Sequence, residues 1–249
     1  MPERWEFAER YGRLVFVPVI AWCMVRVPME ISIAPELTGR VRLGILVLDG
    51  VRVHEADPTL AAEVDAYCKE LRERFGDGKS AEIPGAADAR SLYKALGLDP
   101  TKTRPASEAL ARRALKGETL YRINTLVDAL NLSSLRAQLP FGLYDLDRIE
   151  PPIVLRKGSA GESYEGIRKG PVNVEDRPVL SDARGPFGNP TSDSARTCIS
   201  LEAKRALVTI YAPSTFPTSR LNSVLDDTEA TLTRHCGGSR TERSILPAG

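Results

Sequence analysis

The chain has 249 residues, of which 34 are Lys or Arg and 33 are Asp or Glu, with 42% hydrophobic residues and only 6% aromatic ones. This length accommodates one large domain or two small ones, and the composition excludes a membrane protein, a collagen-like fibre and a wholly disordered chain. The formal net charge of +1 also excludes a protein that binds nucleic acid through bulk positive charge, so such binding would need a local basic patch.

Cysteine and histidine usage leaves little room for metal or covalent chemistry. The four cysteines lie far apart and form no CxxC pair, which argues against a zinc ribbon or a dithiol redox site. His54 and His235 are the only histidines, which argues against a histidine-based catalytic triad or a multi-histidine metal site. We therefore expect no metal and no cofactor, and scattered thiols of this kind are typical of a reduced, cytoplasmic protein.

The ends of the chain differ from its middle. The longest apolar run, residues 14–25, is shorter than the roughly 20 residues that span a bilayer, and the acidic residues before it are unlike the start of a signal peptide. We interpret residues 1–28 as an extension of doubtful structure, either non-native or a loosely attached strand, because clearer patterning begins at Met29. Residues 29–238 then form the domain, and residues 239–249 are predicted to be a disordered tail.

Strand and helix signals alternate in the first half of the domain. Residues 41–48, VRLGILVL, predict a strand buried on both faces. Residues 58–75 predict a helix that begins after the N-cap Asp57 and ends at Gly76. Its apolar residues recur at steps of three and four, as one buried helix face requires. They are Leu60, Val64, Tyr67, Leu71 and Phe75.

Three more helices are predicted before the pattern changes to strands. They cover residues 89–96, the segment between Pro105 and Gly117, and residues 121–139, with a break near Asn131 to Ser134. From Phe141 onward, short extended segments and glycine-marked turns predict strands, and a last helix follows residues 214–218.

Polar residues stand out in two places. Residues 185–197, GPFGNPTSDSART, combine two glycines and two prolines with Asn189, Thr191, Ser192, Asp193, Ser194 and Thr197. Such a loop either presents N–H groups and hydroxyls to a small ligand or satisfies itself through Asx and Ser/Thr turns. Asn124, Asp128 and Asn131 share one helix face, where they either cap neighbouring loops or bind a ligand.

A third feature is the group of cations on the later turns of the helix that follows Pro105. Arg112, Arg113 and Lys116 suit the negative end of a helix, and contact with RNA phosphates is the functional alternative.

Three segments in order resemble a known family. Residues 104–117 (RPASEALARRALKG), 124–149 (NTLVDALNLSSLRAQLPFGLYDLDRI) and 185–197 are similar to the tRNA-editing B3/B4 domain of the bacterial phenylalanyl-tRNA synthetase β-subunit, and more closely to free-standing proteins built from that domain. The resemblance implies a mixed α/β (α+β) fold, with a helical layer packed on mixed sheets and a pocket where the halves meet. In the synthetase that pocket hydrolyses tyrosine wrongly attached to the phenylalanine tRNA.

This resemblance implies a free-standing hydrolase of mischarged aminoacyl-tRNA that does not aminoacylate, because the synthetase motifs for phenylalanine and ATP are absent. Ester hydrolysis needs a positioned water and donors for the developing oxyanion, without requiring a covalent nucleophile. In our hypothesis, the ester or the water is held by Asn189, Thr191 and Ser192. The ammonium group or side chain of the amino acid is held by Asp193 or Ser194. Four further residues complete it, Asn124, Asp128 and Asn131 on the facing wall and Arg104 near the RNA end.

Two other functions remain open. One is a non-catalytic module that holds tRNA or an amino acid, and the other is a small-molecule-binding protein on a reused fold. We expect the acceptor end of tRNA as the partner and no membrane association, while the oligomeric state, the amino acid and the tRNA stay undetermined.

Overall fold

The strand predicted over residues 41–48 lies at the centre of the molecule in our computed structural model, which describes residues 29–76 and 78–247. Strand β2 (Val41–Asp49) pairs with β10 (Arg205–Pro213) on one side and β11 (Ser239–Leu246) on the other. Strand β3 (Phe141–Asp145) completes this four-stranded antiparallel sheet beside β10. The predicted extension over residues 1–28 lies outside the described residues.

The end of the chain was expected to be a disordered tail, but residues 239–246 form strand β11. Residues 239–246 pair with β2 along nearly its whole length, with a bulge between Arg240 and Glu242. Disorder was predicted because the segment SRTERSIL is mostly polar, and this prediction was wrong. An edge strand can be polar, since it is held by backbone hydrogen bonds to its neighbour β2 and buries only part of each side chain.

A second sheet lies against the first. Its strands run in the order β1 (Ile31–Ile33), β4 (Ile153–Lys157), β7 (Pro178–Asp182), β8 (Gly185–Asn189) and β9 (Ser192–Asp193). Strands β1 and β4 are parallel, and the other neighbours are antiparallel. A separate hairpin is formed by β5 (Ser163–Gly166) and β6 (Lys169–Asn173).

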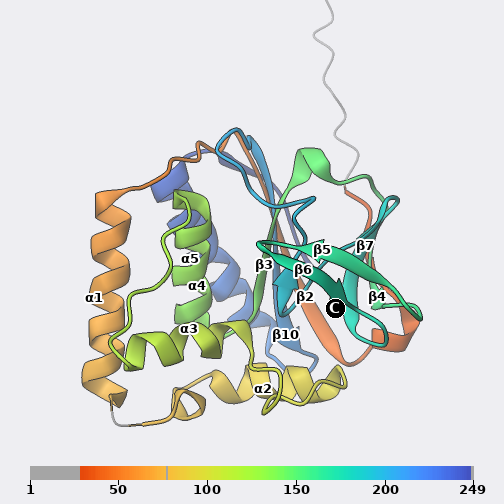
Figure 1. Ribbon diagram of the computed structural model, residues 1–249. Helices are drawn as coiled ribbons and strands as arrows, with labels where there is room; N and C mark the ends of the chain where they lie inside the picture. Colours follow the sequence, from red (N-terminus) through yellow and green to blue (C-terminus); the bar gives the residue numbers. More distant parts are fainter. Residues whose placement is uncertain (1–28, 77, 248–249) are drawn as a thin grey trace, which may run out of the picture.

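The described residues form five α-helices, most of which lie on one side of the central sheet. Figure 1 shows α1 (Pro58–Phe75), α3 (Ala106–Leu115), α4 (Thr125–Ala137) and α5 (Thr218–Cys236) on one side of it, and α2 (Ala86–Ala95) along its lower edge. Short 3-10 turns cover Pro35–Leu37, Ser80–Glu82 and Leu146–Arg148. Within the described ranges, no helix is both long and apolar enough to cross a membrane.

The alternating residues of β2 divide the interior into two cores. Leu46 and Leu48 belong to the core between the sheet and the helices α1, α3, α4 and α5. Leu43, Ile45 and Val47 belong to the core between the sheet, α2 and the second sheet. Both faces of β2 are thus buried, as its sequence predicts, and the molecule has a helical layer and two β layers. The expected mixed α/β fold, with a helical layer packed on mixed sheets, is confirmed.

Helix α1 follows the sequence prediction, whereas α4 departs from it. The Asp57 carboxylate accepts a hydrogen bond from the Thr59 amide at 2.8 Å, as an N-cap does. Helix α4 begins at Thr125 and runs to Ala137 without the predicted break. The hydroxyl of Ser133 donates to the Ala129 carbonyl at 3.1 Å, so this polar residue is accommodated inside a continuous helix.

Candidate functional site

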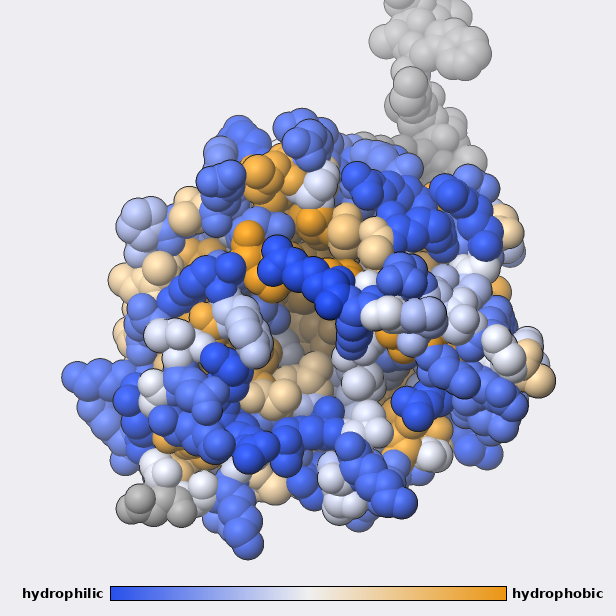
Figure 2. All heavy atoms as spheres, in the orientation of Figure 1, coloured by the Kyte–Doolittle hydropathy of each residue, from blue (hydrophilic) through white to orange (hydrophobic). Residues whose placement is uncertain are grey.

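A cavity of about 580 Å³ lies between α4 and the turn that joins β8 to β9; we call it the α4 pocket. Figure 2 shows a hollow in the middle of this face, with apolar surface inside and a hydrophilic rim. Apolar side chains form most of the lining, including Val127, Leu130, Phe141, Leu143, Ile123, Ile167 and Ile199. The polar lining residues are Asn131, Arg168, Asn189, Thr191, Ser192, Asp193 and Cys198.

The β8–β9 turn is a tight, self-bonded hairpin. The amides of Thr191 and Ser192 both donate to Asn189 Oδ1 at 2.8 Å, which makes Asn189 the residue that closes the turn. Residues 185–189, expected to belong to a Gly/Pro-rich loop, are strand β8. The N–H groups of residues 191 and 192 therefore bond within the turn, as the second interpretation of this segment predicted, and are not free for a ligand.

Two buried tyrosines hold the β8–β9 turn through hydrogen bonds to its carbonyl groups. The Tyr93 hydroxyl donates to the Pro190 carbonyl at 2.8 Å, and burial raises the pKa of Tyr93 to about 12. The Tyr164 hydroxyl donates to the Ser192 carbonyl at 2.5 Å. Because these rings come from α2 and β5, the turn is held by two separate parts of the chain in one position. Such support favours a preorganised site.

Asp193 carries the most perturbed carboxyl group of the pocket. Burial raises its pKa to about 7, while the nearby Tyr144 hydroxyl and the Lys169 charge act in the opposite direction. Its Oδ1 atom is buried and has no hydrogen-bond partner among the described residues. A buried polar atom without a partner is costly, and such atoms are found where a ligand or water completes the site. Because Asp193 also belongs to the pocket lining, its carboxyl group lies beside any hydrogen-bond donor or cation that enters the pocket.

Two glycines make room for Tyr144 beside Asp193. A Cβ atom at Gly188 would lie 2.4 Å from the Tyr144 hydroxyl, and one at Gly142 would lie 2.3 Å from it. The Tyr144 hydroxyl is buried near the Asp193 carboxyl and the Tyr211 hydroxyl, which comes from the neighbouring strand β10. Gly142 in β3 and Gly188 in β8 thus let two strands approach the buried Tyr144 ring closely.

Two of the predicted wall residues have local roles instead. Asn124 is the N-cap of α4 and accepts a hydrogen bond from the Val127 amide at 3.0 Å. Asp128 accepts one from the Ile123 amide at 3.0 Å, and burial raises its pKa. Neither side chain lines the α4 pocket, so the facing wall is apolar, with Asn131 as its polar member.

Ser194 and Thr197 are also outside the pocket lining. Their hydroxyls lie 3.1 Å apart and are buried, and the Ser194 amide donates to the Phe187 carbonyl. These residues fix the segment after β9 rather than facing the cavity. Of the two residues that the sequence offers for the amino acid, Asp193 lines the α4 pocket and Ser194 does not.

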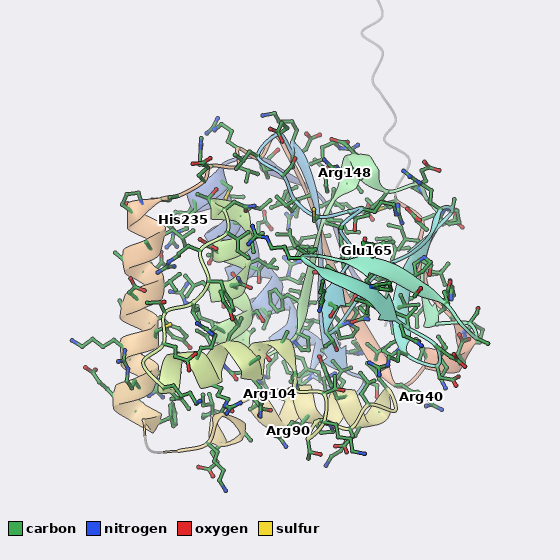
Figure 3. The ribbon with its side chains drawn as sticks, viewed as in Figure 1. Arg40, Arg90, Arg104, Arg148, Glu165 and His235 are labelled. Carbon is green, nitrogen blue, oxygen red and sulfur yellow. The ribbon has the colours of Figure 1, made fainter. Side chains whose placement is uncertain are left out.

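The predicted cations lie together, but away from the α4 pocket. Arg104, Arg112, Arg113 and Lys116 line a separate cavity of about 310 Å³ on α3, together with Ala109, Leu110, Glu118 and Tyr121; we call it the α3 groove. Figure 3 labels Arg104 and Arg90 at this edge of the molecule, where both form ion pairs with Glu108. Arg104 is thus part of the α3 groove and not of the pocket.

Sequence reasoning did not find Arg168 and Lys169, at the tip of the β5–β6 hairpin. Arg168 lines the pocket, and Lys169 Nζ donates to Ser192 Oγ at 2.7 Å. The available signal was the pair of cations between Gly166 and Gly170, which mark a hairpin. The sequence alone does not show that this tip lies beside residues 192 and 193, because that contact depends on how distant segments pack.

Comparison with known families agrees with this arrangement. The family model described as B3/4 domain matches residues 88–234, which include every residue that lines the α4 pocket. This chain belongs to the B3/4 domain family. The resemblance predicted from three sequence segments is therefore confirmed.

Structural comparison adds a distant neighbour of this B3/4 protein. It is similar to an N-terminal fragment of the phenylalanyl-tRNA synthetase β-subunit from Pyrococcus horikoshii, with 12% identity and a TM-score of 0.47. The match covers 89% of this chain and 55% of that fragment, so the B3/4 protein spans about half of its neighbour's length. No curated protein matches the sequence.

Proposed function

We propose that this B3/4 protein binds the aminoacylated acceptor end of a tRNA and hydrolyses the ester of a mischarged amino acid. The observation that carries the proposal is a largely apolar cavity of about 580 Å³ whose lining includes the Asp193 carboxyl group. That volume is in the range of small-molecule sites, and an apolar lining with few convergent polar groups is their usual composition. An amino acid combines an apolar side chain with an ammonium group, which such a pocket accommodates.

Asp193 is the residue that receives the ammonium group. An opposite charge beside a buried carboxylate favours its ionised form, so ligand binding and loss of the Asp193 proton support each other. Because the pKa of Asp193 in the free protein is about 7, binding should strengthen as pH rises through neutrality. Among the residues that the structure describes, no other carboxylate lines this pocket.

The polar rim provides groups for the ester. Thr191 and Ser192 place hydroxyls at the wall, and the Asn189 amide nitrogen makes no hydrogen bond with another described residue. These groups would position the water whose oxygen attacks the ester carbonyl carbon. The carbon–oxygen bond to the ribose then breaks, and the ribose oxygen takes a proton. Arg168 at the mouth offers a charge to a phosphate.

One observation favours a second function, a binding module without catalysis. The backbone amides of the pocket residues Thr191 and Ser192 both donate hydrogen bonds to Asn189 Oδ1. They therefore cannot stabilise an oxyanion unless the turn rearranges. In this alternative the pocket holds the aminoacylated end without breaking the ester.

Deacylation of a panel of mischarged tRNAs decides between these functions. We expect ester loss above the spontaneous rate for at least one of them, and a reduction of tenfold or more in Asp193→Ala and in Asn189→Ala. Ser159→Ala, in an exposed turn, is the matched control and should leave the rate unchanged. Binding without ester loss would establish the non-catalytic module, and unchanged rates in both pocket variants would contradict the placement of the site.

A further inference from the structure

An exposed aromatic side chain lies between the α3 groove and the α4 pocket. Tyr121 is 62% exposed and Ile123 is 49% exposed, in the extended segment that joins α3 to α4. Tyr121 lines the groove, and Ile123 lines the pocket. This segment therefore connects the two cavities at the surface.

Tyr121 is held in place although it is exposed. The Arg113 guanidinium lies 4.2 Å from the centre of its ring, and Nη1 of the same group donates to the Tyr121 hydroxyl at 3.1 Å. Arg113 is itself fixed by two hydrogen bonds to the Thr119 carbonyl and an ion pair with Glu118. One face of the ring is covered by a cation and the rest is open to solvent. A flat, fixed aromatic surface of this kind costs little entropy when a second ring stacks on it.

The surroundings of Tyr121 are strongly basic. The α3 groove and the cavity of about 490 Å³ next to it share Arg104, Arg112 and Lys116. Together they are lined by six cations and two carboxylates, in a chain whose net charge is only +1. These residues are Lys79, Arg90, Arg104, Arg112, Arg113 and Lys116, with Glu108 and Glu118.

Arg112 has a special place in this cluster. Within the part of the chain that the structure describes, its guanidinium forms no ion pair or hydrogen bond, whereas Arg104 and Arg113 are both paired. Cations in excess of the local carboxylates favour an anionic partner. A favourable interaction with the C-terminal end of α3 does not explain Lys79 and Arg90, because these two residues come from other segments.

We propose that Tyr121 is a stacking platform for a base of single-stranded nucleic acid, whose phosphates contact Arg112 and Lys116. The charge excess selects a polyanion, and the adjacent fixed ring selects one with exposed aromatic bases. That combination distinguishes a single strand from a duplex, in which the bases are not available for stacking. The path past Ile123 leads the strand's last nucleotide to the α4 pocket, and only this last step rests on the proposed function.

Binding of short RNA to the full chain tests the platform. The probe is an unacylated, dye-labelled eight-nucleotide single strand that ends in CCA, and a hairpin with the same composition and no overhang is the comparison. We expect the single strand to bind more tightly than the hairpin. Tyr121→Ala should weaken single-strand binding by five- to a hundredfold, while Tyr121→Phe, which keeps the ring, should stay within about threefold of the wild type.

Two further variants separate stacking from charge and from folding. Arg112→Gln should lower the slope of log affinity against log salt by about 0.7, the value for one phosphate contact on a single strand. Leu201→Ala, at another exposed hydrophobic residue, is the control and should change neither quantity. Circular dichroism and thermal unfolding would verify that Tyr121→Ala is folded.

Three outcomes would overturn the proposal. They are equal binding of hairpin and single strand, unchanged affinity in folded Tyr121→Ala, and a loss of self-association in that variant, which would assign the surface to a second copy. Because the RNA is not acylated, the assay is independent of hydrolysis. Intact platform binding with no deacylation of any ester would refute the proposed enzyme alone.

Discussion

Arg196 and Asp182 form a bidentate ion pair below the β8–β9 turn, with Nη1 and Nη2 each 2.9 Å from a carboxylate oxygen. The Asp182 side chain is fully buried and also accepts hydrogen bonds from the amides of Glu150 and Arg184. Burial by itself would raise the pKa of Asp182, but Arg196 and these amides together hold it below its ordinary value. This pair fixes the strand ends that carry the candidate site.

We therefore expect Arg196→Met to destabilise the protein by about 3 kcal/mol, because it leaves a buried carboxylate without its cation. Arg205→Met, which removes an exposed ion pair with Asp147, is the control and should cost less than about 1 kcal/mol. Urea unfolding of both variants at neutral pH measures the difference. Equal losses in the two would show that burial of Asp182 does not strengthen its dependence on Arg196.

The same pair predicts a pH dependence. A carboxylate whose pKa is lower in the folded state contributes stability above its unfolded pKa of about 4, and this contribution is lost as pH falls through the folded value. Without Arg196, the folded pKa of Asp182 rises and the stabilisation disappears. Acid unfolding of Arg196→Met should therefore occur at higher pH than that of the wild type.

Gly188→Ala should be destabilising by about 1–3 kcal/mol. The new Cβ would lie 2.4 Å from the Tyr144 hydroxyl and 2.5 Å from its Cε1 atom, and the ring cannot retreat because it is fully buried against Phe187. Gly170→Ala, where no atom lies within 4 Å of the added Cβ, is the control. Thermal unfolding of the purified variants measures both.

A double variant identifies the clash as the cause. Tyr144→Phe removes the hydroxyl that the new Cβ would contact, and its own effect on stability is measured separately. Combined with Gly188→Ala it should recover part of the lost stability. Strict additivity of the two changes would indicate that the glycine serves backbone conformation instead.

The sequence predicts those elements whose signals are local. Helix α1 has both a periodic apolar face and an N-cap, Asp57, so its bounds of Pro58–Phe75 agree with the prediction. Strand β2 is recognisable because both of its faces are buried, which gives an uninterrupted apolar run. The order of three motifs was also sufficient to identify the B3/4 family.

The remaining features depend on contacts between distant segments. Strand β11 is polar, and it is ordered because the edge of β2 is available to it. The raised pKa of Asp193 arises from burial by distant segments of the chain, and no local pattern predicts that burial. Asn124 and Asp128 were assigned to the pocket wall because they share a helix face with Asn131, but helix capping takes priority at the start of α4.

Asp193→Asn should stabilise the folded protein, and more at pH 8 than at pH 5. A carboxyl whose pKa is raised to about 7 by burial binds its proton more tightly in the folded state, so its contribution to stability is lost as pH rises from about 4 to about 7. The amide has no such cost. At pH 8 the expected gain is at least about 1.4 kcal/mol, the free energy of one pKa unit.

Unfolding free energies of Asp193→Asn and the wild type across pH 4–9 measure this effect. Asp226→Asn, which changes an exposed carboxylate, is the control and should give a nearly constant difference over this range. A gain that is independent of pH would mean that the Asp193 carboxyl ionises normally. A pH-dependent cost of the Asp193 carboxyl to the fold would support its proposed role in ligand binding.

Asp57→Ala should cost about 1–2 kcal/mol, because Asp57 both caps α1 and contacts the buried His235 ring. The hydrogen bond from His235 holds the pKa of Asp57 below its ordinary value, so this stability is present above about pH 4 and is lost as pH falls through the folded pKa. Glu70→Ala, which breaks an exposed pair with Arg74, is the control and should cost less than about 0.5 kcal/mol. Chemical unfolding at pH 7 compares them. A smaller loss in Asp57→Ala than in the control would mean that α1 is held by its apolar face alone.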